Sequence, residues 1–497
     1  MNSLFVYPPN PDWLWSFKHA LRFVKKKTGF PHLGLLTVAS LLPPEWNKCL
    51  VDMNIQDLTQ DDLKWADYVF ISAASMQRNS VREIARFCKQ TGRKIIAGGP
   101  LFTYEWERFH DIDHFIINEA ELTLPLLLND LEAGHAKRVY ASREYPDIKK
   151  SPIPSWDIAR LKQYDIVSVQ YSRGCPYNCE FCNVSDLFGH SLRTKTAEQI
   201  IAELDSLYTL GWRKDVCFVD DNFVGNKKQI KAEILPALIE WRKGKKGIPF
   251  QTFASINLAD DEELMGMMYE AGFDCVFVGI ETPNEDSLIE CNKHQNMNRD
   301  LIESIKRIHG AGLRVQGSFI VGFDSDTVSV FQHQINFIQK SGIVAAKVNQ
   351  LNALYGTRLY ERMAQEGRIR TDSTDESEKL ESTNIIPKMG TEALQKGYKN
   401  LMLHIYSPRP YYERIKTFLR QYKKPRIRGP LELQHILACF RSIYHIGLKG
   451  IERSYYWHLM FWTLFRRPDL FPISITFAVY GYHFRKYCER FKCGNSK

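Results

Sequence analysis

The chain has 497 residues, of which 44% are hydrophobic and 25% are charged, and its formal net charge is +9. This length predicts two or three domains, and the composition is that of a globular protein without a long disordered region. The charge is concentrated at one end: residues 409–497 hold 18 Lys and Arg against 5 Asp and Glu, a net of +13, which leaves −4 for the rest. Eleven cysteines show no paired spacing outside one trio, and residues 1–10 contain no signal-peptide pattern. We therefore expect a reducing, cytoplasmic location.

Residues 1–145 alternate short apolar runs with helical patterns. The runs that predict strands are Leu4–Tyr7, Cys49–Met53, Tyr68–Ser72, Lys94–Ala97 and His114–Ile117. Between them, residues 33–42, 81–91 and 123–133 have helical spacing. This alternation predicts a doubly wound, Rossmann-like parallel α/β sheet, whose ligand crevice lies at the carboxyl ends of its strands.

A proline-rich segment at residues 146–165 reads as a linker, and a cysteine-bearing loop follows it. The predicted strand Val167–Tyr171 runs into a Gly-Cys-Pro turn that delivers Cys175, Cys179 and Cys182. The spacing C-x3-C-x2-C supplies three soft ligands and no evident fourth. A structural zinc site is usually closed by four ligands, whereas a [4Fe-4S] cluster can be held by three cysteines when its fourth iron takes an outside ligand. Zinc binding and unligated buried thiols are the alternatives.

With Phe181 before the last cysteine, the motif C-x3-C-x-F-C resembles the signature of the radical S-adenosylmethionine (SAM) enzymes. The resemblance implies that the open iron binds the amino and carboxylate groups of SAM. It also implies that one electron from the cluster cleaves SAM to a 5′-deoxyadenosyl radical. A reducing protein such as a flavodoxin or ferredoxin would then be a partner.

Residues 166–370 repeat a strand–helix pattern six times, which predicts a partial TIM-like (β/α)6 barrel with its active groups at the carboxyl ends of the strands. The predicted strands are 167–171, 216–219, 250–256, 275–280, 314–321 and 346–351, and the predicted helices are 196–210, 227–243, 261–271, 299–312 and 327–341. The resemblance implies SAM contacts from Phe181, Asp221, Asn222, Ser255, Asn257 and Glu281.

The strand ends of residues 1–145 are similar to the cobalamin-binding domain that precedes the radical SAM domain in one branch of the family. The residues that this similarity implies in cobalamin binding are Ser75, Met76, Gln77, Gly98, Gly99, Asn118 and Glu119. A glycine pair permits close backbone approach to a ligand. The D-x-H-x-x-G motif that supplies a cobalt-ligating histidine is absent, so a bound cobalamin would lack that axial ligand. A vestigial or substrate-binding Rossmann-like domain is the alternative.

Residues 371–497 predict a basic, aromatic and mostly helical domain, preceded by a polar loop at 368–389. Its two apolar stretches, 455–465 and 470–484, are shorter than the roughly 18 to 20 residues that span a bilayer, so no transmembrane helix is predicted. Basic residues beside aromatic ones suit peripheral membrane contact, and a helical lid on the barrel is the alternative. This part resembles the extra domain of the radical SAM subgroup that includes hopanoid C-2 methylases.

The resemblance implies cobalamin-dependent methylation of an unactivated carbon on a lipid-like or natural-product substrate. The cofactors carry that chemistry, so no catalytic side chain is predicted beyond the cluster ligands. Radical SAM carbon–carbon bond formation, cyclisation or rearrangement without cobalamin turnover is the alternative reaction, and a non-catalytic iron–sulfur protein is the alternative class. Because the positive charge is interleaved with apolar runs, no nucleic-acid partner is expected.

Overall fold

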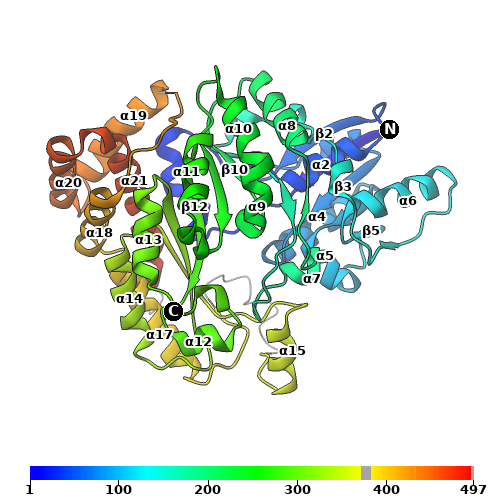
Figure 1. Cartoon of the computed structure of the whole chain (residues 1–497). Coiled ribbons are helices and arrows are strands. Elements are labelled where there is room, and N and C mark those ends of the chain that lie inside the picture. The colour runs from blue at the N-terminus through cyan, green and yellow to red at the C-terminus, as the bar shows by residue number, and fades with distance from the viewer. Residues whose placement is uncertain (371–381, 431, 494–497) are drawn as a thin grey trace.

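The structure is a computed structural model of the chain, which describes residues 1–370, 382–430 and 432–493 (Figure 1). Residues 371–381 of the predicted polar loop lie outside the described residues. A first α/β unit, shown in blue and cyan, stands beside a second one in green, and helices of the C-terminal part, in orange and red, pack on the far side of the second unit.

The first unit is a parallel sheet of six strands in the order β2-β1-β3-β4-β5-β6, as the Rossmann-like pattern predicts. Its strands are β1 (Asn2–Tyr7), β2 (Asn47–Asp52), β3 (Tyr68–Ser72), β4 (Lys94–Gly98), β5 (His114–Ile117) and β6 (Val139–Ala141). Helices α2 (Leu33–Leu41), α3 (Gln60–Trp65), α4 (Arg78–Gln90), α5 (Pro100–Glu105) and α6 (Ala120–Glu132) connect them. The central strands are apolar on both faces because helices cover both sides of the sheet. Strand β6 was not predicted, since three residues are too few to show a period.

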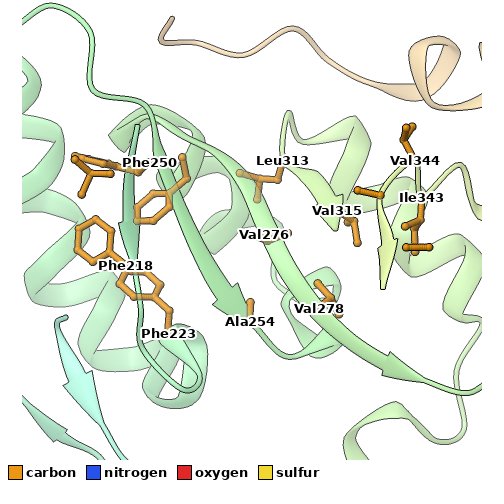
Figure 2. Packing of buried hydrophobic residues seen from close by; sticks show 14 of the residues in the cluster. Phe218, Phe223, Phe250, Ala254, Val276, Val278, Leu313, Val315, Ile343 and Val344 are labelled. Carbon is orange, nitrogen blue, oxygen red and sulfur yellow. The ribbon is translucent and has the colours of Figure 1, made fainter. Parts of the chain in front are cut away.

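The second unit is a parallel sheet of six strands in the order β14-β13-β12-β11-β10-β7, which is the predicted partial barrel. Its strands are β7 (Val167–Val169), β10 (Val216–Phe218), β11 (Phe250–Ala254), β12 (Phe273–Glu281), β13 (Arg314–Val321) and β14 (Ala346–Gln350). The outer helices are α8 (Ala197–Thr209), α10 (Leu235–Arg242), α11 (Glu262–Ala271), α13 (Leu301–Gly310) and α14 (Val330–Ser341). Figure 2 shows Phe218, Phe223 and Phe250 grouped where two of these strands meet the helices. Strand β7 ends two residues earlier than predicted because the Tyr171 amide donates to the Asp220 carboxylate.

The inner face of this barrel is partly exposed to solvent. Strands β13 and β14 alternate buried residues with partly exposed ones, and Gln316, Ser318, Lys347 and Asn349 are on the partly exposed side. On β11, the Phe253 side chain is 40% exposed although its strand lies within the sheet. Outward-facing residues pack on helices, so this inner face is the accessible one.

The C-terminal part is helical, as predicted. Its helices are α15 (Arg358–Gln365), α17 (Thr391–Ile405), α18 (Pro408–Gln421), α19 (Leu433–Ser442), the π-helical η12 (Ile443–Leu448), α20 (Arg453–Arg466), α21 (Phe471–Cys488) and α22 (Arg490–Cys493). Helices α17 and α18 pack on α14 of the barrel. Among the described residues, no helix combines the length and apolar character that crossing a membrane requires.

A segment that the sequence patterns did not reveal ties the three parts together. Residues between β1 and α2 form η1 (Leu14–Ser16), α1 (Lys18–Leu21) and η2 (Arg22–Val24), which lie against α19 and α21. The His483 ring of α21 hydrogen-bonds the Leu14 carbonyl at 2.7 Å, and the Trp15 ring meets Phe277 of β12 edge-on at 6.2 Å. One hydrophobic cluster consequently includes buried residues from Phe5 to Cys488.

Candidate active site

The three cysteines leave the barrel on one loop. This loop follows β8 (Ser172–Arg173), and Gly174 at its start has a φ of +98°. A Cβ atom at Gly174 would lie 2.6 Å from the Ser191 carbonyl, so the turn requires glycine. Burial raises the pKa of the Cys175 and Cys182 thiols, that of Cys182 to about 11. Electrostatic repulsion from the Cys179 thiolate also raises both pKa values. The predicted trio therefore lies on one loop, and its thiols interact electrostatically.

Three separate segments hold this cysteine loop through its backbone. The Cys175 amide donates to the Gly189 carbonyl at 3.2 Å, and the Glu180 amide donates to the Cys291 carbonyl at 3.0 Å. The Leu359 amide of α15 donates in turn to the Glu180 carbonyl at 3.1 Å. The loop is thus fixed before any ligand binds.

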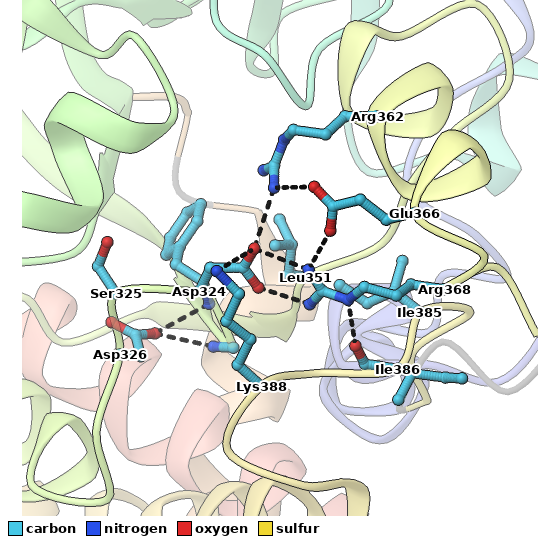
Figure 3. A network of polar contacts seen from close by, with 12 residues as sticks. Asp324, Ser325, Asp326, Leu351, Arg362, Glu366, Arg368, Ile385, Ile386 and Lys388 are labelled. Carbon is cyan, nitrogen blue, oxygen red and sulfur yellow. Dashed lines mark hydrogen bonds and ion pairs between the residues drawn. The ribbon is translucent and has the colours of Figure 1, made fainter.

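An ion-pair network around Asp324, shown in Figure 3, adds side-chain support to the same loop through Arg362 and Glu180. Arg362 of α15 donates to both carboxylate oxygens of Glu180, at 2.7 and 2.9 Å, and to Asp324 at 3.0 Å. Asp324 also pairs with Arg368 and with Lys388 at 3.4 Å. Burial alone would raise the pKa of Asp324, but the hydrogen bonds from Arg368 and Arg362 outweigh it and lower that pKa to about 2. Arg362 therefore links the cysteine loop to the segment that follows β13.

Two carboxylates after β10 anchor the start of the loop. Asp220 is buried and accepts hydrogen bonds from the Ser172 amide and hydroxyl and, at 3.2 Å, from the Tyr171 amide. Burial raises the pKa of Asp220 to about 7. The Asp221 carboxylate accepts from the Gly174 amide at 3.2 Å.

A chain of polar side chains runs from β10 and β11 to the cysteine loop. The Asn222 side-chain oxygen accepts from the Ser255 amide at 3.1 Å, and the Ser255 hydroxyl donates to Asn257 at 2.6 Å. Asn257 donates to the Tyr177 hydroxyl, on the loop itself, at 2.9 Å. The Asn222 amide nitrogen is buried and has no hydrogen-bond partner among the described residues. Three of the predicted SAM-binding residues are thereby brought together beside the cysteines.

Glu281, at the end of β12, lies in the left-handed region with a φ of +62° and is buried. Its carboxylate pairs with the Lys293 ammonium at 2.9 Å. A Cβ atom at Gly279 would lie 2.3 Å from the Glu281 carboxylate, so glycine makes room for this pair. Burial by itself lowers the pKa of Lys293, but Glu281 and the thiols of Cys179 and Cys182 outweigh burial and raise it. Lys293 also lies 6.0 Å from the ring of Phe181.

At the carboxyl edge of the first sheet, several predicted cobalamin residues are already bonded within the protein. The buried Gln77 amide donates to the Pro8 carbonyl at 2.8 Å, and the Asn118 amide donates to the Ser142 carbonyl at 2.6 Å. A Cβ atom at Gly98 or Gly99 would meet the chain's own atoms, at 3.1 Å and 2.7 Å respectively. Ser75 is exposed and Met76 is half-buried. A ligand at this edge would thus meet backbone atoms and small or apolar side chains.

Glu119 joins this edge to the cysteine loop. Its carboxylate accepts from Arg193 at 2.7 Å and also pairs with Arg173, which lies two residues before Cys175. The other terminal guanidinium nitrogen of Arg173, Nη2, pairs with the Glu121 carboxylate at 2.8 Å. All four side chains are largely buried. The carboxyl edges of the two sheets therefore face each other at the cysteines.

A family model described as the radical SAM superfamily matches residues 169–338, and one described as a domain of unknown function (DUF4070) matches residues 357–496. The chain is 33% identical over 481 residues to the hopanoid C-2 methylase of Rhodopseudomonas palustris, covering 93% of this chain and 89% of that protein. The chain belongs to the radical SAM superfamily. It is also 36% identical over 495 residues to an uncharacterized methyltransferase of Synechocystis sp., covering 98% of this chain and 92% of the relative.

Solved radical SAM structures share the fold. The cobalamin-dependent enzyme OxsB with aqua-cobalamin and SAM bound matches with a TM-score of 0.63 at 16% identity, over 99% of this chain and 84% of OxsB. The methyltransferase TsrM from Kitasatospora setae matches with a TM-score of 0.63 at 13% identity, over 98% of this chain and 99% of TsrM. The predicted family, fold class and enzymatic nature are confirmed.

Membership of the radical SAM superfamily implies a [4Fe-4S] cluster and SAM, and the residues around the loop fit both groups. The three free thiols of the motif would hold the cluster, and the Asn222 amide nitrogen, which has no partner among the described residues, is a donor suited to a SAM oxygen. The side-chain oxygens of Gln295 and Asn296 are buried, with no partner among the described residues, and can accept from an amino group or hydroxyl. Within the same described residues, no three His, Cys, Asp or Glu side chains group closely enough to hold a single metal ion.

The inner face of the radical SAM barrel carries aromatic rings and one lysine. The Phe253 and Phe277 rings stack at 4.7 Å, and the Lys347 ammonium lies 4.6 Å from the Trp13 ring of the N-terminal segment. Burial lowers the pKa of Lys347 to about 8. This surface combines apolar area with a cation.

Sequence patterns did not predict several residues that lie near the cysteine loop. Lys293 follows a short helix in a stretch without periodicity, and Gln295 donates to the Cys179 sulfur at 3.7 Å. In the first unit, the His32 ring before α2 lies 4.6 Å from the Tyr7 ring, tilted by 49°, and 3.5 Å from the Ser72 hydroxyl. Burial lowers the pKa of His32 to about 4, so this ring is neutral near pH 7. Nothing in the spacing of Lys293 and Gln295 marks them.

Replacing Arg362 with alanine is expected to loosen the cysteine loop. The substitution leaves Glu180 without its two-bond partner, so we expect reconstituted protein to lose its cluster several-fold faster in air, which the decay of visible absorption would measure. Arg299→Ala is the matched control, because Arg299 also binds a carboxylate, that of Asp260, through two nitrogens but away from the cysteines. Equal decay rates for the two variants would contradict the positioning role of Arg362.

Proposed function

We propose that this radical SAM enzyme is a cobalamin-dependent C-methyltransferase that acts on an unactivated carbon of a lipid-like substrate. One observation carries the proposal: Glu119, after β5, pairs with Arg173 and Arg193, which flank the cysteine loop. The carboxyl edge of a Rossmann-like sheet is where such folds bind cofactors. A methyl donor held there would face the radical SAM site directly.

In this proposal, residues 1–145 form the cobalamin domain, 146–165 the linker, 166–370 the radical SAM barrel and 371–497 the basic helical domain. When bound, the cluster and SAM supply the 5′-deoxyadenosyl radical, and cobalamin supplies the methyl group. The protein positions these groups and excludes water, which is what radical chemistry requires of its enzyme. No side chain is assigned as a general acid or base.

Each group is assigned to residues of this chain. Cys175, Cys179 and Cys182 ligate the cluster. The proposed SAM-binding residues are Phe181, Asp221, Asn222, Ser255, Asn257 and Glu281, of which Asn222 has an unpartnered amide nitrogen among the described residues. Ser75, Met76, Gly98 and Gly99 contact cobalamin, whereas Gln77, Asn118 and Glu119 shape the loops around it, since their side chains are bonded within the protein.

The substrate class rests on similarity and on the inner face of the barrel. The relative from Rhodopseudomonas palustris is named for methylation of hopanoids, and a further relative, from Chlorobaculum tepidum, for methylation of a bacteriochlorophyllide. Rings of Phe253 and Phe277 suit an apolar, ring-bearing body of this kind. We include a flavodoxin or ferredoxin as electron donor, a cytoplasmic location and peripheral contact with the inner membrane face in the same proposal.

An optical spectrum and a cobalt analysis of protein purified without oxygen, from cells supplied with cobalamin, test the proposal. About one cobalt per chain, beside the absorption of the iron–sulfur cluster, supports radical methylation. Cluster without cobalt under these conditions would instead favour radical carbon–carbon bond formation, cyclisation or rearrangement. In that case residues 1–145 would be a substrate or docking domain.

A further inference from the structure

Exposed large apolar side chains are concentrated on one part of the molecule, formed by α19, η12 and α20 at the left of Figure 1. The exposed residues there are Leu433, Ile436, Phe440, Tyr444, Leu448, Ile451, Tyr455, Phe461, Leu464 and Phe465. Phe440 is 64% exposed and Leu448 is 58% exposed. Soluble proteins rarely expose apolar side chains together over so short a stretch unless something binds there.

Five of these residues form a continuous stripe along α19 and η12. Leu433, Ile436, Phe440, Tyr444 and Leu448 are spaced by three or four residues, so they share one side of the helix. The other side of this helix is buried at Ala438, Ser442 and Ile446. The stripe, hereafter the α19 stripe, is thus an outward apolar face on a helix that is already packed.

Positive charge surrounds the α19 stripe. Helix η2 packs against α19, where Arg441 donates to the Phe23 carbonyl and the Phe23 ring lies 5.8 Å from the His445 ring. Arg22 of η2 and, in the turn after it, Lys25 and Lys27 are exposed. At the other end of the stripe, Lys449 and Arg453 are exposed.

Negative charge is neutralised in this region. Between residues 433 and 466 the one acidic residue is Glu452. Its side chain is fully buried and paired with Arg485. Glu432, just before the stripe, pairs with Lys214 at 3.1 Å. The exposed charge beside the stripe is therefore basic.

We propose that the α19 stripe and its basic rim dock this protein on the surface of an anionic lipid bilayer. Apolar and aromatic residues on a helix flanked by Lys and Arg bind the interface between headgroups and acyl chains without spanning it. The inference deepens the proposed function, on which it rests, because an enzyme that methylates a membrane lipid must reach the bilayer. It names the surface that makes the contact.

Co-sedimentation with vesicles tests this inference on the full chain without substrate. We expect binding to phosphatidylcholine vesicles that contain phosphatidylglycerol, and much weaker binding to phosphatidylcholine alone. The double variant Phe440→Asp, Leu448→Asp is expected to weaken partitioning about hundredfold, because it removes two apolar anchors and adds negative charge. Lys25→Glu with Lys27→Glu is expected to weaken it about tenfold.

The matched control is Ile289→Asp with Val328→Asp, two exposed apolar residues outside this region, at 52% and 65% exposure. This control should bind vesicles like the unmodified protein. Circular dichroism melting curves confirm that each variant is folded.

Three outcomes would overturn the inference: no binding to anionic vesicles, equal binding by the α19 stripe variant, or a dimer on size exclusion that this variant dissociates. The last result would make the α19 stripe an interface between two copies of the chain. Formation of 5′-deoxyadenosine by the same variants separates the two proposals. Loss of vesicle binding with intact SAM cleavage leaves the proposed function standing.

Discussion

Cys182→Ala is expected to abolish cluster assembly and, with it, the formation of 5′-deoxyadenosine from SAM. Two remaining thiols cannot hold a [4Fe-4S] cluster that already leaves one iron open, so the loss of SAM cleavage should exceed about a thousandfold. Iron and sulfide analysis of anaerobically reconstituted protein, followed by chromatography of the SAM products, measures both effects. Because Cys182 lies on a loop that is held by its backbone, the variant should still fold.

The matched control is Cys291→Ala. Cys291 is buried, its carbonyl accepts from the Glu180 amide, and it lies outside the C-x3-C-x2-C motif. We expect this variant to keep its cluster and its SAM cleavage. If Cys182→Ala yields 5′-deoxyadenosine at the rate of the control, the three-cysteine assignment is wrong.

Glu119→Ala is expected to destabilise the junction between the two sheets by about 3 kcal/mol, because it leaves two largely buried arginines without their shared carboxylate. Arg173 keeps Glu121 as a partner, but Arg193 keeps no carboxylate among the described residues and retains the carbonyls of Pro146 and Phe188 and the Tyr145 ring. Urea unfolding followed by fluorescence and by circular dichroism measures the change. The two probes should diverge if the first sheet separates from the barrel before either unfolds.

Asp111→Ala serves as the comparison for Glu119→Ala, since it also removes a carboxylate from an ion pair, that with Lys89, but at the exposed surface of the same α/β unit. Exposed pairs contribute little, so the unfolding midpoint should not change measurably. A Glu119 variant as stable as the Asp111 variant would show that the junction does not depend on this carboxylate.

Patterns along the chain determined the kinds of elements and the metal-ligand motif. Strands Tyr68–Ser72 and Arg314–Val321 were predicted with their observed bounds. The first is an apolar run, as expected of a parallel strand covered on both faces, whereas the second alternates buried residues with partly exposed ones before it ends in an apolar run. The C-x3-C-x2-C spacing is equally local, since three thiolates on one loop need no partner from elsewhere in the chain. Short elements were not predicted, because β6 has only three residues and the turns between β1 and α2 show no hydrophobic period.

Only the tertiary structure decided which groups meet. Glu119 was predicted as a cobalamin contact from its position after a strand, and the structure shows that its carboxylate is bonded to Arg173 and Arg193, 54 and 74 residues away. Lys293 reaches Glu281 from a stretch without periodicity, and Trp13 meets Lys347 across the whole length of the barrel sequence. A hydrogen bond or ion pair between distant residues depends on how the sheets and helices pack. The spacing of residues along the chain therefore does not predict such a contact. By itself, the sequence therefore determined the longer strands and helices and the thiol loop of this protein, and packing alone brought the two sheet edges together at the cysteines.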